Sequence, residues 1–214
     1  MYATEISVYW IGAIIFLLST MGFLIHNKQK YANRFLGASE VFVSYLTTIS
    51  YVVMALAIAT VPSPFGGVIY WSRWLFYMAS CSILALNVAA VFGKKDTGDF
   101  FEISFLTSFV MFCGFLASFV TGWEKWLFFG LSSGAYMGLL LVLFKNVDYQ
   151  TNASRRLIVW WVAIFWSLFP VVWILAPTGF GLVSTFVESV SYLLLDVITK
   201  IAFGVFLVNR YKIL

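Results

Sequence analysis

Long apolar runs alternate with short polar segments along the whole chain. The runs cover residues 5–25, 36–60, 68–92, 101–122, 126–145, 157–176 and 183–208. A transmembrane helix needs about 20 consecutive apolar residues, and the runs lack the period-two alternation of the strands in a membrane barrel. The pattern therefore predicts an all-α membrane protein, a bundle of seven transmembrane helices that forms a single domain over residues 1–214. The first run is long enough to remain as a helix, so we expect no cleaved signal peptide.

Composition supports a membrane protein and excludes an ordinary soluble domain. Hydrophobic residues make up 62% of the chain and charged residues 10%, whereas soluble domains carry about 25% charged residues. The net charge of +4 comes from basic residues in short loops, which favours membrane topology over nucleic-acid binding. The two cysteines, Cys81 and Cys113, lie within apolar runs, so neither a disulfide framework nor a metal site is expected.

The distribution of lysine and arginine predicts the orientation. The first, third and fifth loops and the C-terminal tail contain ten basic residues, against one, Lys125, in the loops of the opposite side. The ten are Lys28, Lys30, Arg34, Lys94, Lys95, Lys145, Arg155, Arg156, Arg210 and Lys212. Basic loops stay in the cytoplasm. We therefore expect a multi-pass protein of the cell membrane with its N-terminus outside and its C-terminus in the cytoplasm.

Charged residues inside the predicted helices are the strongest functional signal. The last helix carries Asp196 and Lys200, four residues apart and so on one face. A charge at the bilayer centre costs about 2.5–3.5 kcal/mol even on lenient scales, so such residues usually serve a function. The pair is either a charge-neutralising contact or a desolvated amine that condenses with an aldehyde, with the carboxylate as counterion.

Two segments carry a resemblance to a known family. The segment LLLDVITKIAFG at 193–204 is similar to the last helix of microbial (type 1) rhodopsins, and WSLFPVVW at 166–173 is similar to their sixth helix. The resemblance implies all-trans retinal, bound covalently to Lys200 as a protonated Schiff base with Asp196 as counterion. It also implies a retinal pocket on the last five helices. The pocket residues would be Tyr77, Cys113, Gly114, Ser133, Tyr136, Trp166, Phe169, Pro170 and Trp173, although helix packing alone explains several of the small ones.

The third helix narrows the resemblance. Arg73, Phe76, Ser80 and Asn87 recur at intervals of three, four and seven, which places them on one stripe. Aligning Arg73 with the arginine of outward proton pumps puts Phe76 at their proton-acceptor aspartate. An alternative register pins Trp74 to the family's tryptophan, but it would put the cation of Arg73 beside a cationic imine.

In the preferred register, the third helix resembles that of schizorhodopsins, which are light-driven inward proton pumps. Phe76 and Ser80 match their pattern. Cys81 follows Ser80, and it either tunes the retinal environment or is a small buried hydrophobe. Asn87 departs from the pattern, because schizorhodopsins have a cytoplasmic glutamate there.

The resemblance implies transport rather than catalysis of a reaction on a free substrate, so the protein is not expected to be an enzyme. Because Phe76 offers no acceptor, Asp196 must stay charged with help from Arg73, and the proton leaves towards the cytoplasm. The alternatives are a sensory photoreceptor without net ion pumping and, less compatible with Asp196, an anion transporter. The expected partners are retinal, protons and lipid, and the resemblance implies a homo-oligomer, a trimer.

Two further carboxylates have open roles. Glu40 lies eleven residues before Tyr51, at a depth comparable to Asn87, and it either supplies the missing cytoplasmic carboxylate or contacts water at the headgroup boundary. Glu188 lies eight residues before Asp196, about two turns closer to the exterior. It either relays protons inward or caps a hydrated vestibule.

Overall fold

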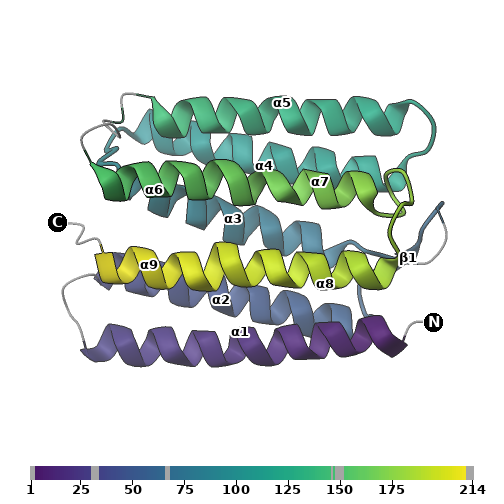
Figure 1. Cartoon of the computed structure of the whole chain (residues 1–214), viewed down its shortest axis with the longest axis horizontal. Coiled ribbons are helices and arrows are strands. Elements are labelled where there is room, and N and C mark those ends of the chain that lie inside the picture. Colours follow the sequence, from purple (N-terminus) through teal and green to yellow (C-terminus); the bar gives the residue numbers. More distant parts are fainter. Residues whose placement is uncertain (1–2, 30–33, 66–67, 146, 148–151, 211–214) are drawn as a thin grey trace.

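The computed structural model describes residues 3–29, 34–65, 68–145, 147 and 152–210. Seven helical spans long and apolar enough to cross a membrane lie within this part of the chain, which confirms the predicted bundle (Figure 1). The first five spans are single helices, and the last two are each divided by a π-helical turn. The single helices are α1 (Ala3–Gln29), α2 (Arg34–Ala55), α3 (Ser72–Val91), α4 (Thr97–Phe119) and α5 (Glu124–Phe144).

The sixth and seventh spans contain a π-helical segment near their middle. The sixth consists of α6 (Ala153–Trp161), η2 (Val162–Trp166) and α7 (Ser167–Leu175), and the seventh of α8 (Thr185–Asp196), η3 (Val197–Ala202) and α9 (Phe203–Arg210). Single π-turns inside helices are frequent at functional sites. Here η3 begins directly after Asp196 and contains Lys200, so the widened turn carries the lysine singled out by sequence.

The predicted second and third helices were too long, because each included residues of the segment that connects them. The second helix ends at Ala55 rather than 60 and the third begins at Ser72 rather than 68, because the strands β1 (Thr60–Pro62) and β2 (Val68–Tyr70) form an antiparallel pair between them. An apolar run does not distinguish a strand from a helix by itself. Several strand residues are β-branched, which favours the strand, and Ala57 takes a positive φ of 52° that ends the helical path.

The helices pack in sequence order, and the seventh span closes the bundle against the first, second and sixth. In sequence, α1 lies against α2, α2 against α3, α3 against α4 and α4 against α5, and the seventh span contacts α1, α2 and α7. The β strands and the N-terminus lie at one end of the bundle, and the last described turn of α9 lies at the other (Figure 1). We call these the N-terminal end and the C-terminal end.

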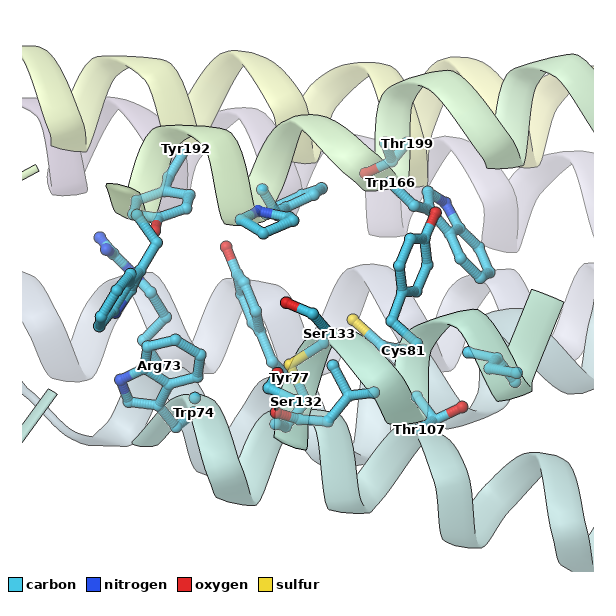
Figure 2. Close-up of a pocket in the computed structure, with 18 of the residues that line it drawn as sticks. Arg73, Trp74, Tyr77, Cys81, Thr107, Ser132, Ser133, Trp166, Tyr192 and Thr199 are labelled. Atoms are coloured by element: carbon cyan, nitrogen blue, oxygen red, sulfur yellow. Dashed lines mark hydrogen bonds between the residues drawn. The ribbon is translucent and has the colours of Figure 1, made fainter. Parts of the chain in front are cut away.

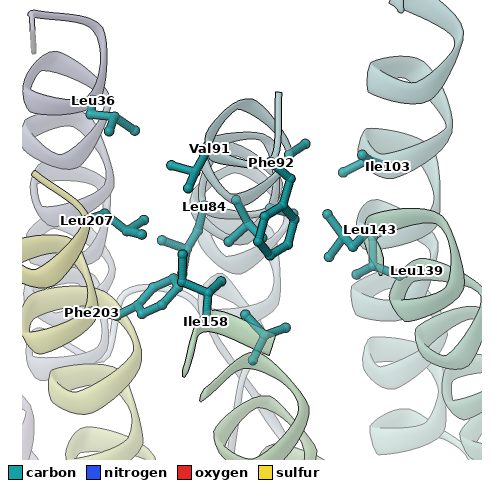
Figure 3. Packing of buried hydrophobic residues seen from close by; sticks show 14 residues of the cluster. Leu36, Leu84, Val91, Phe92, Ile103, Leu139, Leu143, Ile158, Phe203 and Leu207 are labelled. Atoms are coloured by element: carbon teal, nitrogen blue, oxygen red, sulfur yellow. The ribbon is translucent and has the colours of Figure 1, made fainter. Parts of the chain in front are cut away.

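Apolar side chains close the C-terminal half of the bundle (Figure 3). Residues from α2 to α6 and from α9 form this cluster, and most are fully buried. The labelled members are Leu36, Leu84, Val91, Phe92, Ile103, Leu139, Leu143, Ile158, Phe203 and Leu207. A smaller cluster on α1, α2 and α8 includes Tyr9, Phe16 and Tyr51. Other leucines, such as Leu141, Leu157 and Leu194, face outward, as expected for side chains that meet lipid.

Two leucines on α5 test this assignment of interior and lipid-facing surface. Leu143 is fully buried and Leu141 is 71% exposed. Leu143→Ala should lower the free energy of unfolding by about 2–5 kcal/mol, because it leaves a cavity in a packed core. Leu141→Ala is the matched control and should have a much smaller effect. Circular dichroism melting in detergent micelles checks this, and equal shifts of the two midpoints would contradict the assignment.

Candidate functional site

An ion pair lies in the middle of the seventh span. The Nζ atom of Lys200 is 2.8 Å from Oδ1 of Asp196, and the two side chains are 1% and 0% exposed. The sequence spacing predicted this contact, and the structure confirms that the two groups meet inside the bundle. A buried charge left without a partner is strongly destabilising, so each group needs the other.

Two tyrosines complete the surroundings of the carboxylate. The hydroxyl of Tyr51 on α2 donates to Oδ2 of Asp196 at 2.8 Å, and that of Tyr77 on α3 donates to the same atom at 2.6 Å. Lys200 Nζ also lies 4.0 Å from the centroid of the Tyr77 ring, within the range of a cation–π interaction. Asp196 therefore has a cation beside one oxygen and two hydrogen-bond donors on the other, so both oxygens are engaged.

A cavity of about 110 Å³ is lined by Lys200 and walled by α3, α4, α5, η2, α7 and the seventh span. Figure 2 shows Arg73 and Trp74 towards one end of it and Trp166 and Thr199 towards the other, with Tyr77 between. The walls are mostly aromatic and apolar, as in most small-molecule sites. The lining includes Trp74, Tyr77, Cys81, Gly114, Ser133, Tyr136, Trp166, Phe169, Pro170, Trp173 and Lys200.

Specific contacts fix the aromatic walls. Trp173 Nε1 donates to Ser118 Oγ at 3.1 Å, and its ring stacks on Phe129 with centroids 5.0 Å apart. Gly114 has a steric role, because a Cβ there would lie 2.7 Å from the Trp74 ring. On α7 the wall is therefore held by the contacts of Trp173. On α4 it needs a glycine at position 114, because a side chain there would collide with Trp74.

Arg73 lies towards the N-terminal end of the cavity. Its guanidinium carbon is 4.6 Å from the centroid of the Tyr192 ring, and its Nη1 atom is 4.0 Å from Oε1 of Glu188. Arg73 also lines a second cavity together with Glu188. Glu188 and Asp196 thus lie on the same helix about two turns apart, as predicted, and Arg73 lies next to Glu188.

Glu40 is buried inside the bundle. It is 0% exposed, as is Asn87, and Asn87 Nδ2 donates to Glu40 Oε1 at 2.8 Å. Gly204 on α9 faces the other oxygen, and a Cβ on Gly204 would lie 2.5 Å from Oε2. The similar depth of Glu40 and Asn87 expected from the sequence therefore corresponds to a direct contact.

Seven of the predicted site residues lie outside the lining of the main cavity: Asp196, Glu40, Asn87 and Glu188, described above, and also Phe76, Ser80 and Cys113. Phe76 is half-buried, and Ser80 and Cys113 are buried, but none of them belongs to the described residues that form its wall. On α3 the wall is formed by Arg73, Trp74, Tyr77, Cys81 and Leu84. Phe76 and Ser80 therefore lie beside the site rather than in it.

Sequence reasoning missed the contacts of Tyr51 and Tyr192. Tyr51 binds Asp196, and Tyr192 lines the cavity beside Arg73. A tyrosine on an apolar helix is common and carries no signal of its own. Tyr192 lies one helical turn before Asp196, so helical spacing could have identified it. Tyr51 lies on another helix, and only the tertiary structure shows its contact.

Comparison with known proteins gives a consistent result. The sequence model of the family described as "Bacteriorhodopsin-like protein" matches residues 3–214. Sensory rhodopsin-2 of Natronomonas pharaonis is 26% identical, over 92% of this chain and 85% of that protein. Bacteriorhodopsin of Halobacterium salinarum is 25% identical, over 95% and 79%. The crystal structure of schizorhodopsin 4 has a TM-score of 0.86 and 36% identity, over 97% of this chain and 100% of that one.

The cavity fits the retinal that such proteins bind through a lysine Schiff base. A covalent site of this kind needs a buried amine at the wall of an elongated apolar space, and Lys200 is the lysine that lines the cavity. Trp166, Phe169, Pro170 and Trp173 line the same space. The residues present therefore suit a polyene aldehyde.

Removing the carboxylate of the buried pair should destabilise the protein prepared without retinal. Asp196→Asn leaves the Lys200 ammonium unpaired, which costs about 3–5 kcal/mol. The control is Asp99→Asn, which breaks the 3.0 Å pair with Lys94 at a partly exposed site, where an ion pair contributes less than about 1 kcal/mol. Thermal unfolding of the two variants measures the difference, and equal destabilisation would show that the buried pair has no special role.

Proposed function

The chain belongs to the bacteriorhodopsin-like family of retinal-binding membrane proteins, and from this we propose that it is a light-driven pump that moves protons into the cell, with retinal on Lys200. Bound retinal supplies the absorption of visible light and an isomerisation that reorients the proton of the Schiff base. The rest of the mechanism depends on which side chains can accept and replace that proton. In this proposal the C-terminal end of the bundle faces the cytoplasm, as the basic loops indicate.

The observation that carries the proposed direction is the absence of a free acceptor beside Lys200. Among the described residues that line the main cavity, none is an aspartate or glutamate. Asp196 contacts Lys200 through one oxygen, but its other oxygen already accepts hydrogen bonds from Tyr51 and Tyr77. A proton on the Lys200 nitrogen therefore has no free carboxylate on the N-terminal side that could accept it.

The C-terminal side offers a carboxylate in the Glu40–Asn87 pair. Glu40 is fully buried, and one of its oxygens, Oε2, has no hydrogen-bond partner among the described residues. Buried polar residues also follow Glu40 along one face of α2, at Ser44, Thr47 and Tyr51. These side chains connect the level of Glu40 with that of Asp196, so we propose that the proton leaves through Glu40.

A sensory function is the second candidate, because a sensory rhodopsin is among the relatives. In that case the same light-driven change would alter a partner protein without net transport. The two functions differ in a measurable quantity, the sustained pH change outside the membrane under illumination.

Illumination of intact cells that express the protein and contain retinal should make the unbuffered medium more alkaline. A protonophore should abolish the change, and Lys200→Ala should give neither colour nor a pH response. Acidification would overturn the inward direction. A normal photocycle without a sustained pH change would support the sensory function instead.

Replacing the proposed release group tests the route. Glu40→Gln keeps a hydrogen bond to Asn87 but cannot carry a proton, so proton release should slow by about 10²-fold, the low end of what a positioned proton-transfer group contributes. Glu102→Gln, at an exposed acid on α4, is the matched control. Flash photolysis with a pH-sensitive dye measures release, and unchanged kinetics in Glu40→Gln would remove Glu40 from the path.

A further inference from the structure

A second cavity lies at the N-terminal end of the bundle, beyond Arg73. Its volume is about 50 Å³, and a single water needs roughly 10–15 Å³ by the same kind of measure, so several waters fit. The polar side chains on its wall come mainly from α1, α3, α8 and the segment before α8, with others on β2 and α4. They include Glu5, Tyr9, Arg73, Thr178, Thr185 and Glu188.

Unpaired donors show that this cavity suits water. Nε and Nη2 of Arg73 and the hydroxyl of Thr178 are buried without a hydrogen-bond partner among the described residues. Buried donors are almost always satisfied, by protein or by ordered water. Arg73 and Trp74 line this cavity and also the main one, so the two spaces meet at Arg73.

Glu5 lies at the level of Thr185, one turn of α8 nearer the N-terminal end of the bundle than Glu188. It is 5% exposed, and the hydroxyl of Thr185 on α8 donates to its Oε1 atom. Glu188 follows Thr185 by one turn on the same helix and approaches Arg73. Next to them, the Tyr9 hydroxyl and Ser189 Oγ are hydrogen-bonded at 2.9 Å. Two carboxylates from helices far apart in sequence therefore line the same small hydrated space.

We propose that Glu5 is the proton-uptake residue of the outer side and passes its proton to Glu188 across this cavity. The inference deepens the proposed inward transport and rests on it. Glu5 takes a proton from external water, the proton moves to the Glu188 carboxylate, and Glu5 is left as a carboxylate that can be protonated again. From Glu188 the proton moves past Arg73 towards the Lys200 nitrogen.

The groups that face Glu5 favour a transfer role. They are Thr185 and Glu188 on α8, Tyr9 on α1, Tyr70 on β2 and Arg73 on α3. Arg73 is the cation of this set, and it lies at 4.0 Å from Glu188. The positive charge of Arg73 repels a proton on Glu188, so Glu188 holds the proton only briefly and passes it on towards the Lys200 nitrogen.

A purely structural role makes a different prediction. Glu5 lies beside the first turn of α8, where a negative group also interacts favourably with the helix dipole. Glutamine at this position still accepts the hydrogen bond from Thr185 but cannot carry a proton. The two roles are therefore separated by the kinetics of proton uptake rather than by stability.

The experiment follows recovery of the Lys200 chromophore after a flash, at a series of external pH values. Glu5→Gln should slow recovery by about tenfold or more, below the 10²–10⁴-fold contribution of an optimal proton-transfer group because water can still deliver protons. Glu5→Asp should recover faster than Glu5→Gln. The matched control is Glu124→Gln, an exposed acid in the first turn of α5 at the same end of the bundle, which should behave like the wild type.

Wild-type recovery in Glu5→Gln at every external pH would overturn the inference. If Glu5→Gln yields no coloured protein, Thr185→Val decides, because it releases Glu5 from its donor: a changed dependence of recovery on external pH supports the inference, and an unchanged one overturns it. Failure of the proposed function is a separate result, since it appears in the wild type as acidification of the medium or as no sustained pH change.

Discussion

The rest of the structure depends on one ion pair, between Lys200 and Asp196, inside a protein made almost wholly of apolar helices. Neither charge can remain there alone, because an unpaired buried charge is strongly destabilising. The pair is 2.8 Å apart, and Asp196 also binds Tyr51 and Tyr77. Three spans are therefore held together at this level by polar contacts, in a membrane where apolar burial gives little drive for helices to associate. The same contacts place Lys200 at the wall of the cavity.

Ionisable groups lie at three levels along the bundle. Glu5, Glu188 and Arg73 are at the N-terminal end, Asp196 and Lys200 in the middle, and Glu40 towards the C-terminal end, where the apolar cluster around Leu84 and Phe203 closes the interior. A continuous file of water would let protons leak down their gradient. Separated levels instead require a change at Lys200 before a proton can pass, which is what a pump needs.

Hydropathy predicted the seven spans, and helical spacing predicted the contact of Asp196 with Lys200. The hairpin between α2 and α3 was missed, because its valines and isoleucine are as apolar as the residues of the helices on either side. Glu40 was expected at the depth of Asn87, and the two side chains form a hydrogen bond. The tyrosines that bind Asp196 and the position of Glu5 beside Thr185 could not be predicted, because these contacts join helices whose relative rotation no local pattern specifies.

The Glu40 contact also links the C-terminal level to the ion pair. A carboxylate on α2 fits here because Asn87 on α3 donates to it and because Gly204 leaves space, since a Cβ there would lie 2.5 Å from Oε2. Gly204 is four residues after Lys200, so the two lie one turn apart on the same face of the seventh span. The π-helical segment η3 spans this turn up to Ala202. The backbone of the seventh span therefore approaches the Glu40 carboxylate at Gly204, four residues after Lys200, without an intervening side chain.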